Sequence, residues 1–224
     1  AAHYSYADGV MTVCEGGKDS VFPCPDPYGV LRNVMEDNAC RGDASLPPFF
    51  GGLTGYLAFE SIECAEPGIR FACPNVEGYK DLDFMLMDKV CAFDRETDEI
   101  LIIYSGYAAD REEALSAAES VFAETERILR KGDEYDCPLR LRGEVGEIFS
   151  KARHIENVKA AKRRILRGDV SQVVISNGNE AEAEGDLLGV YALLRRRDKT
   201  KHMCYFSSDD LVAAVASPGT ILHI

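Results

Sequence analysis

Short apolar runs with strand-like spacing alternate along the chain with a few longer amphipathic segments. YSYADG and VMTVC lie on either side of Gly9, so we predict a β-hairpin over residues 4–14 that turns at this glycine. Asp26 directly before Pro27 is typical of a helix start, because aspartate caps the first turn and proline suits its first position. The N-terminal part is therefore predicted to combine strands with one short helix.

Two further regions of the N-terminal half favour strands. FFGGLTGYLAFESIE (49–63) is a run of aromatic and aliphatic residues interrupted by glycines, which indicates a bulge or a close approach of two backbones. Residues 84–93 and 99–104 are two apolar runs separated by the turn-like DRETD, and this pattern predicts an antiparallel hairpin.

Two amphipathic helices are predicted in the centre of the chain. The first begins after Asp110, which forms a capping-box pattern with Glu113, and ends at Gly132. The second covers about 151–167 and ends at Gly168. The spacing of the second predicts that its basic residues face water and that its apolar residues face inward, which are Ile155, Val158, Ile165 and Leu166.

The C-terminal part returns to strands. VSQVVIS (170–176) is predicted as a strand, followed by a turn at 177–179 and a helix capped by Asp186. MCYF (203–206) and LVAAVAS (211–217) are predicted as a second hairpin. The fold class that follows is α+β, with antiparallel sheets and packed helices.

The segment around Pro138 is polar and shows no sustained periodicity, so we place a linker there. The predicted organisation is an N-terminal region over 1–135, a linker over 136–150 and a second region over 151–224.

Composition excludes several functional classes. The chain has 224 residues, of which 46% are apolar, and a formal net charge of −13. That charge repels phosphate backbones, so we expect no nucleic-acid partner, and we interpret the basic residues of 151–167 as a solvated helix face. No run approaches the roughly 20 apolar residues of a membrane span, and the N-terminus lacks the features of a signal peptide, so we expect a cytoplasmic protein without a membrane partner. The eight cysteines show no metal-ligand spacing and are expected to be reduced thiols.

Several strings, in order, resemble the chorismate-utilising enzymes, and within them component I, the large subunit, of anthranilate synthase. PFFGGLTGYLAFE (48–60) and DLDFMLMDKVCAFD (81–94) are similar to the N-terminal region of that family. VKAAKRRILRGDVSQVVIS (158–176) is similar to its helix, Gly-Asp turn and Gln-Val-Val strand. The resemblance continues through three further strings, GDLLGVYALLRRRD (185–198), MCYF (203–206) and VAAVASP (212–218).

The resemblance implies an aminating lyase of tryptophan biosynthesis that converts chorismate and ammonia to anthranilate and pyruvate. It also implies Mg²⁺ as cofactor and a glutamine amidotransferase subunit as the ammonia source. In the resembled family, one segment precedes the part matched here. The magnesium carboxylates, the catalytic histidine and the substrate loops follow that part. We therefore expect no metal ligand in this chain, and we expect the isolated segment to be inactive.

Gln172 is the candidate catalytic residue. Alternation over 170–176 places it on the same strand face as Val170, Val174 and Ser176. By resemblance, relatives that add water to chorismate carry a lysine base at this position, whereas relatives that use ammonia carry glutamine. An amide cannot take a proton from water, but ammonia needs no such base. The residue therefore favours amination, and the structural alternative is a strand amide paired with its neighbours.

Two positions match the inhibitor pocket of the resembled family, namely Met203 and Tyr205, although core packing is an alternative role for both. Both prolines of the family string are absent here, and this loss predicts altered feedback regulation. Gly219 stands where the family has a glutamate at the edge of the active site, so this position lacks an acid.

Two other functions stay open. One is component I of aminodeoxychorismate synthase in the folate pathway, which shares the amination step and keeps the enolpyruvyl group. The other is a non-catalytic binding or regulatory homologue. If the matched part stands alone, uncovered strand edges and apolar faces also predict poor solubility or a homo-oligomer.

Overall fold

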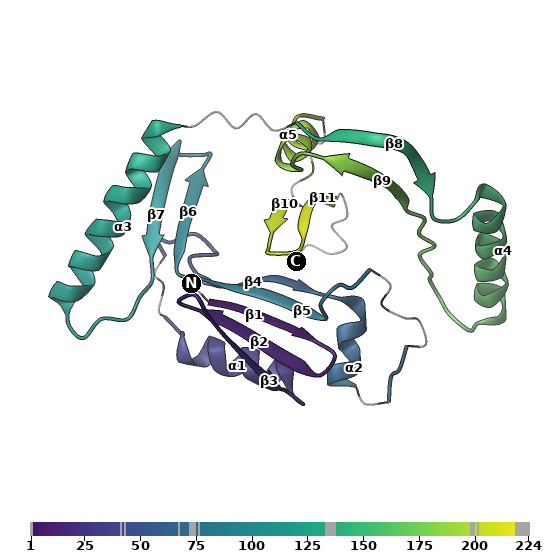
Figure 1. Ribbon diagram of the computed structural model, residues 1–224, viewed down its shortest axis with the longest axis horizontal. Helices are drawn as coiled ribbons and strands as arrows, with labels where there is room; N and C mark the ends of the chain where they lie inside the picture. Colours follow the sequence, from purple (N-terminus) through teal and green to yellow (C-terminus); the bar gives the residue numbers. More distant parts are fainter. Residues whose placement is uncertain are drawn as a thin grey trace. The chain divides into compact units, whose positions relative to one another are not determined.

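The chain folds into two compact units, Ala1–Asp133 and Glu134–Ile224, each described here by itself. The computed structural model describes residues 2–40, 42, 44–66, 68–71, 75, 77–132, 138–197, 200 and 202–217. The pairings between its strands are all antiparallel, and helices accompany the sheets in both units, so the predicted α+β class is confirmed (Figure 1).

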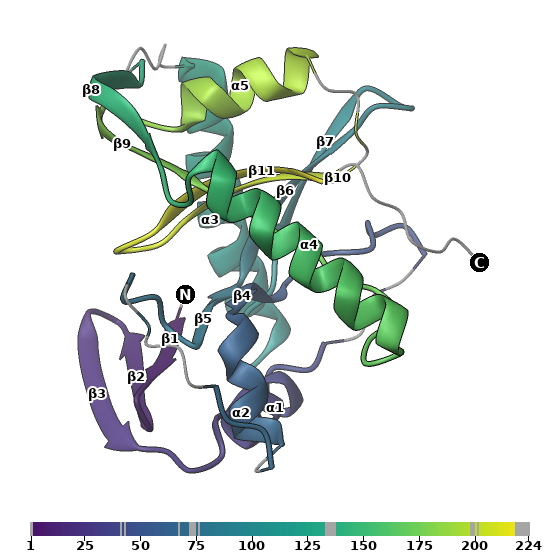
Figure 2. The same cartoon turned by 90° about the vertical axis from the view of Figure 1, so that its right-hand side faces the viewer.

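The first unit is built on a five-stranded sheet with helices α1 and α2 on one face (Figures 1 and 2). The strands in spatial order are β3 (Lys18–Pro23), β2 (Val10–Glu15), β1 (Ala2–Ala7), β5 (Leu82–Met87) and β4 (Gly52–Leu57). The covering helices are α1 (Pro27–Asp37), α2 (Ile62–Ala65) and the short 3₁₀ turn η1 (Phe59–Ser61). The predicted hairpin is β1–β2, and its turn has positive φ at Asp8 and Gly9.

Apolar side chains from this sheet face α1 and α2 and form the core of the unit. Tyr6, Met11, Cys24 and Leu82 are buried, and residues of α1 pack against them. The predicted cap of α1 is confirmed, since the Asp26 carboxylate accepts a hydrogen bond of 2.8 Å from the Gly29 amide.

The opposite side of the same strands holds a buried carboxylate. Asp83 in β5 is completely buried, and its Oδ1 is hydrogen-bonded to His3 Nε2 of β1. Lys80 Nζ lies 4.0 Å from the other oxygen. A buried carboxylate needs such partners, because an unpaired charge away from water is costly.

The first unit also contains a hairpin with a long helix. β6 (Lys89–Asp94) pairs with β7 (Glu99–Tyr104), and α3 (Arg111–Lys131) contacts β7. The predicted caps of α3 are confirmed: Asp110 accepts the amides of Glu112 and Glu113, and Gly132 ends the helix with φ of 52°.

One prediction in this region is wrong in part. The apolar run 84–93 is not a single strand, because the chain changes sheets at Asp88: residues before it belong to β5 and residues after it to β6. The carbonyl of Asp88 instead accepts the amide of Ser105 at 2.8 Å. A continuous apolar run does not show where a strand leaves one sheet for another.

The second unit consists of two hairpins and two helices. The hairpins are β8 (Arg140–Glu147) with β9 (Asn179–Glu184), and β10 (His202–Ser207) with β11 (Val212–Ser217). The helices are α4 (Lys151–Arg167) and α5 (Leu188–Arg197). The predicted ends of α4 and the predicted β10–β11 hairpin are confirmed, with Gly168 ending α4 at φ of 78°.

Strand β8 lies inside the segment 136–150 that we expected to be a linker. Its register shifts between Arg142 and Gly146, and Gly143 has positive φ. This irregularity breaks the period of two by which a strand is recognised from sequence. The two compact units divide earlier, between Asp133 and Glu134.

Candidate functional site

The candidate site of the second unit starts from α4 and the segment that follows it. The turn at Gly168 sends the chain back along the helix, and an ion pair of 3.0 Å joins Arg164 Nη1 to Asp169 Oδ2. Downstream, the Asn177 side chain exchanges two hydrogen bonds with the backbone of Phe149, at 2.9 and 3.0 Å. Both ends of the segment 170–176 are thus tied to residues flanking or within α4.

The segment 170–176 itself differs from its prediction. It is irregular, without strand pairing, and Gln172 is exposed. The alternating pattern suits a strand, but a strand needs a partner backbone. Among the described residues, none provides one. The prediction that residues 170–176 form a strand is therefore wrong for this structure, and the catalytic role of Gln172 stays a prediction.

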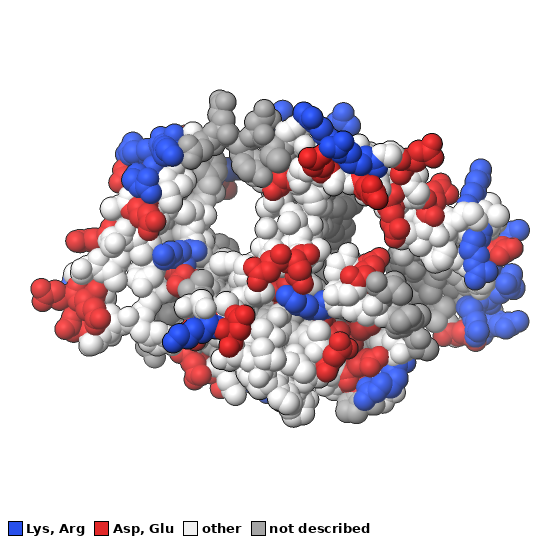
Figure 3. Space-filling model, viewed as in Figure 1, with Lys and Arg blue, Asp and Glu red and all other residues white. Residues whose placement is uncertain are grey.

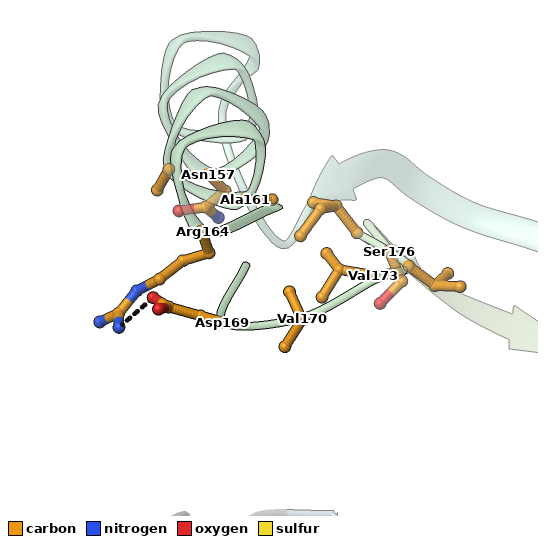
Figure 4. A pocket seen from close by; sticks show the side chains of 10 residues that line it. Asn157, Ala161, Arg164, Asp169, Val170, Val173 and Ser176 are labelled. Carbon is orange, nitrogen blue, oxygen red and sulfur yellow. Dashed lines mark hydrogen bonds and ion pairs between the residues drawn. The ribbon is translucent and has the colours of Figure 1, made fainter. Parts of the chain in front are cut away.

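An open hollow of about 690 Å³ lies between α4 and this segment (Figure 4). We call it the α4 groove. Six of its ten lining residues are alanine, valine or isoleucine, and the Arg164–Asp169 pair lies at one end while Ser176 lies at the other. The lining residues are Asn157, Ala160, Ala161, Arg164, Asp169, Val170, Val173, Val174, Ile175 and Ser176. Gln172 is not among them, so the groove does not bring the candidate residue together with a charged partner.

Helix α4 is more exposed than its pattern predicts. Leu166 is 86% exposed, and Ile155 and Ile165 are exposed as well, whereas Val158 is half-buried. The expectation that all four face a core is therefore wrong for three of them. The basic residues of α4 are exposed as predicted, and they gather over this helix in Figure 3. His154, which is next to Arg153, is half-buried, and its Nδ1 is shielded from solvent without a hydrogen-bond partner.

Tyr205 belongs to a second cluster, between β10 and α5. Its hydroxyl donates a hydrogen bond of 3.0 Å to Asp186 Oδ1, and its ring lies 5.9 Å from the ring of Tyr191. Burial, and then the neighbouring Asp186 carboxylate, raise the pKa of the Tyr205 phenol. The same carboxylate accepts the amide of Leu188 at 2.6 Å and so caps α5, as predicted.

Met203 is half-buried on the same side of β10 as Tyr205, as the period of two requires. The sequence showed the cap at Asp186 and the face of β10 separately. No pattern in the sequence indicates that Asp186 and Tyr205 meet. The contact of the Arg195 guanidinium with the Tyr191 ring, at 5.9 Å from the ring centre, is likewise not indicated by the sequence. Tyr205 thus packs against Tyr191 and hydrogen-bonds the carboxylate that caps α5, and its role in inhibitor binding stays a prediction. Gly219 lies outside the described residues.

Neither the α4 groove nor the cluster around Tyr205 forms a metal site. Within the ranges that the structure describes, no group of three or more His, Cys, Asp or Glu side chains is placed to hold an ion. The described residues therefore do not fit the Mg²⁺ that the resemblance implies, and we derive no step through it. The same ranges contain no helix long and apolar enough to cross a membrane.

The profile of the chorismate binding enzyme family matches residues 4–224, which is nearly the whole chain. The chain therefore belongs to the chorismate binding enzyme family.

Three proteins similar to this chain are components of anthranilate synthase. Component 1 of anthranilate synthase from Aquifex aeolicus is 27% identical over 217 residues, which is 95% of this chain and 44% of the relative. The Bacillus caldotenax protein of the same name is 28% identical over 225 residues, covering 94% of this chain and 44% of the relative. The crystal structure of anthranilate synthase component I from Streptococcus pneumoniae superposes with a TM-score of 0.73 at 23% identity, over 97% of this chain and 48% of that one. The chain thus spans less than half the length of these relatives.

Proposed function

We propose that this chain is the N-terminal and central part of an aminating chorismate enzyme, and that the complete protein is component I of an anthranilate synthase. The observation that carries the proposal is Gln172 within a family match over residues 4–224. An amide at this position can hydrogen-bond a substrate but cannot activate water, and ammonia attacks without a base. The relatives described above, each named as component 1 of anthranilate synthase, support the same product.

The reaction we propose balances without an oxidant or a reductant. Ammonia forms a new carbon–nitrogen bond on the chorismate ring as the ring hydroxyl leaves as water. Elimination then breaks the enolpyruvyl ether bond, and the ring loses a proton to become aromatic. The products are anthranilate, pyruvate and water.

Partners and location belong to the same proposal. A glutamine amidotransferase subunit would supply ammonia, and Mg²⁺ would be held by residues other than those described here. A cytoplasmic location agrees with the cysteines, because the six within the described residues form no disulfide with one another. Self-association of the isolated chain stays a prediction.

Product analysis of the full-length gene product with chorismate and ammonium chloride tests the proposal. We expect anthranilate and pyruvate in equal amounts. Aminodeoxychorismate without pyruvate would support the folate-pathway alternative, and no product would support a non-catalytic homologue. Residues 1–224 alone serve as the control, and we expect them to form neither product.

A further inference from the structure

Helix α4 carries an exposed stripe of lysines and apolar residues that does not belong to the α4 groove. The stripe consists of Lys151, Ile155, Lys159, Lys162 and Leu166, which follow one another at spacings of four, four, three and four residues and so share one helix face. All five are exposed, and Leu166 is 86% exposed. None of the five lines the α4 groove. We call this surface the α4 stripe.

The lysines of the α4 stripe carry unpaired positive charge. Within the described part of the chain, the ion pairs of α4 are Arg153 with Glu156 and Arg164 with Asp169, and neither includes a lysine of the stripe. The helix has seven basic residues and one acidic residue, a formal net charge of +6, and the basic side chains gather over it in Figure 3. Exposed apolar side chains beside unpaired cations gain free energy when an apolar, acidic surface covers them.

The first unit carries a surface of that kind where η1 joins α2. Phe59 is 77% exposed, and its ring centre lies 5.3 Å from that of Phe71, which is exposed as well. Glu60 is exposed, and no described residue forms an ion pair with it. Glu63 accepts the backbone amide of Phe71, and its carboxylate lies 4.0 Å from Arg70 Nη1. We call Phe59, Glu60, Glu63 and Phe71 the η1 patch.

Negative charge is in excess around the η1 patch and in the whole first unit. Burial raises the pKa of the neighbouring Asp81, and the carboxylates of Asp8, Glu60 and Glu63 raise it further. Residues 1–133 include 25 acidic and 11 basic residues, a formal net charge of −14. Residues 134–224 include 13 acidic and 14 basic residues, a net charge of +1. The η1 patch therefore attracts a cationic surface that also offers apolar contact.

We propose that the α4 stripe of one copy of this chain binds the η1 patch of a second copy, with apolar side chains at the centre of the contact and lysines against carboxylates at its rim. The two surfaces differ, so the contact is head-to-tail and can extend to rings or filaments. The chain itself supplies both charges of this pair. Nucleic acid and anionic lipid would also offer negative charge to the stripe, but the first unit, with its net charge of −14, repels them. The inference does not depend on the reaction proposed above.

Sedimentation velocity of the 224-residue chain tests this inference. We expect self-association that increases with protein concentration in about 50 mM NaCl and is lost in about 500 mM NaCl, because salt screens exposed charge pairs. One double variant, Lys159→Glu with Lys162→Glu, reverses the charge of the stripe, and another, Phe59→Ser with Glu60→Lys, alters the patch. Each variant alone should associate at least about tenfold more weakly, since like charges then meet. An equimolar mixture of the two should form a 1:1 complex, because each supplies the surface that the other lacks.

Arg111→Glu with Arg127→Glu is the matched control for the stripe variant, because it changes the net charge by the same amount at exposed positions of α3. We expect this control to keep self-association, and circular dichroism of all variants verifies folding. A chain that is monomeric at every concentration, association that salt does not weaken, equal weakening by the control, or a mixture without a 1:1 complex would each overturn the inference. Binding of a monomeric chain to phosphatidylserine vesicles would overturn it as well and would assign the stripe to a membrane surface.

Discussion

Gly55 of β4 and Asp83 of β5 approach so closely that a Cβ at position 55 would clash with the Asp83 carbonyl oxygen. The glycine was expected to mark a close approach of two backbones, and this contact confirms the expectation. The position matters for the core, because β5 carries both the buried Leu82 and the buried Asp83.

Gly55→Ala should therefore destabilise the first unit. A methyl group would force β4 away from β5, and overpacking against backbone costs about 3 kcal/mol of unfolding free energy. Urea unfolding followed by circular dichroism measures the change. Gly68→Ala is the control, because a Cβ there meets nothing within 4 Å, and its effect should stay within about 0.5 kcal/mol. Equal losses of unfolding free energy in both variants would show that the close approach of β4 and β5 at Gly55 is not the cause.

Alkaline pH should weaken the first unit through Tyr6. Burial, and then a hydrogen bond that its hydroxyl donates to Cys64, raise the pKa of Tyr6 from 10.0 to about 12. The fold thus favours the protonated phenol. Its contribution to stability is complete below pH 10 and is lost as the pH rises from 10 to about 12.

Urea midpoints measured between pH 9 and about 12 test this prediction. We expect Tyr6→Phe to flatten the decline in stability above pH 10. Met11→Leu is the control, since it perturbs the same core without removing a titrating group, and it should keep the wild-type decline. A decline that is unchanged in Tyr6→Phe would contradict the assignment.

The sequence predicted where individual helices and strands lie better than it predicted which strands pair with one another. Caps such as Asp26 and Asp110 depend on a few neighbouring residues, and the structure confirms both. The sheet change at Asp88 and the irregular segment 170–176 depend on which backbones are available for pairing, and no periodicity encodes that. The sequence shows that position 172 carries an amide. It does not show that the segment around Gln172 is unpaired or that the side chain is exposed.

The two units should differ in local stability, and two hairpins of equal strand length allow a direct comparison. β1–β2 and β10–β11 each pair six-residue strands, but among the residues whose burial the structure describes only the first hairpin contributes buried ones, including Tyr6 and Met11. We expect the paired amides of β10–β11 to exchange at least about tenfold faster in the isolated chain. Hydrogen exchange with mass spectrometry measures this. Equal rates would show that the second unit is stabilised as well as the first.

Removing the Tyr205 hydroxyl should loosen the contact between β10 and α5. Tyr205→Phe loses the hydrogen bond to Asp186 but keeps the ring contact with Tyr191, so we expect a lower melting temperature. It should also remove a phenol of raised pKa from the spectrophotometric titration. Tyr191→Phe is the matched control, because it keeps the same ring pair and the Tyr205 hydrogen bond. A larger decrease in melting temperature for Tyr191→Phe would show that the Tyr191 hydroxyl contributes more to stability than the Tyr205 hydroxyl.

Under the proposed function, exchanging Gln172 for a base should redirect the reaction of the complete enzyme from ammonia toward water. Gln172→Lys introduces an amine that can take a proton from water, and a positioned general base contributes about 100-fold or more to such a step. We expect a hydroxylated ring product from chorismate without ammonia, and a lower rate of anthranilate formation with it. Ser171→Lys is the control, because it adds the same amine at the adjacent exposed position and leaves the Gln172 amide in place. Liquid chromatography with mass spectrometry distinguishes the products. Identical product mixtures from the two variants would show that Gln172 does not determine whether ammonia or water reacts.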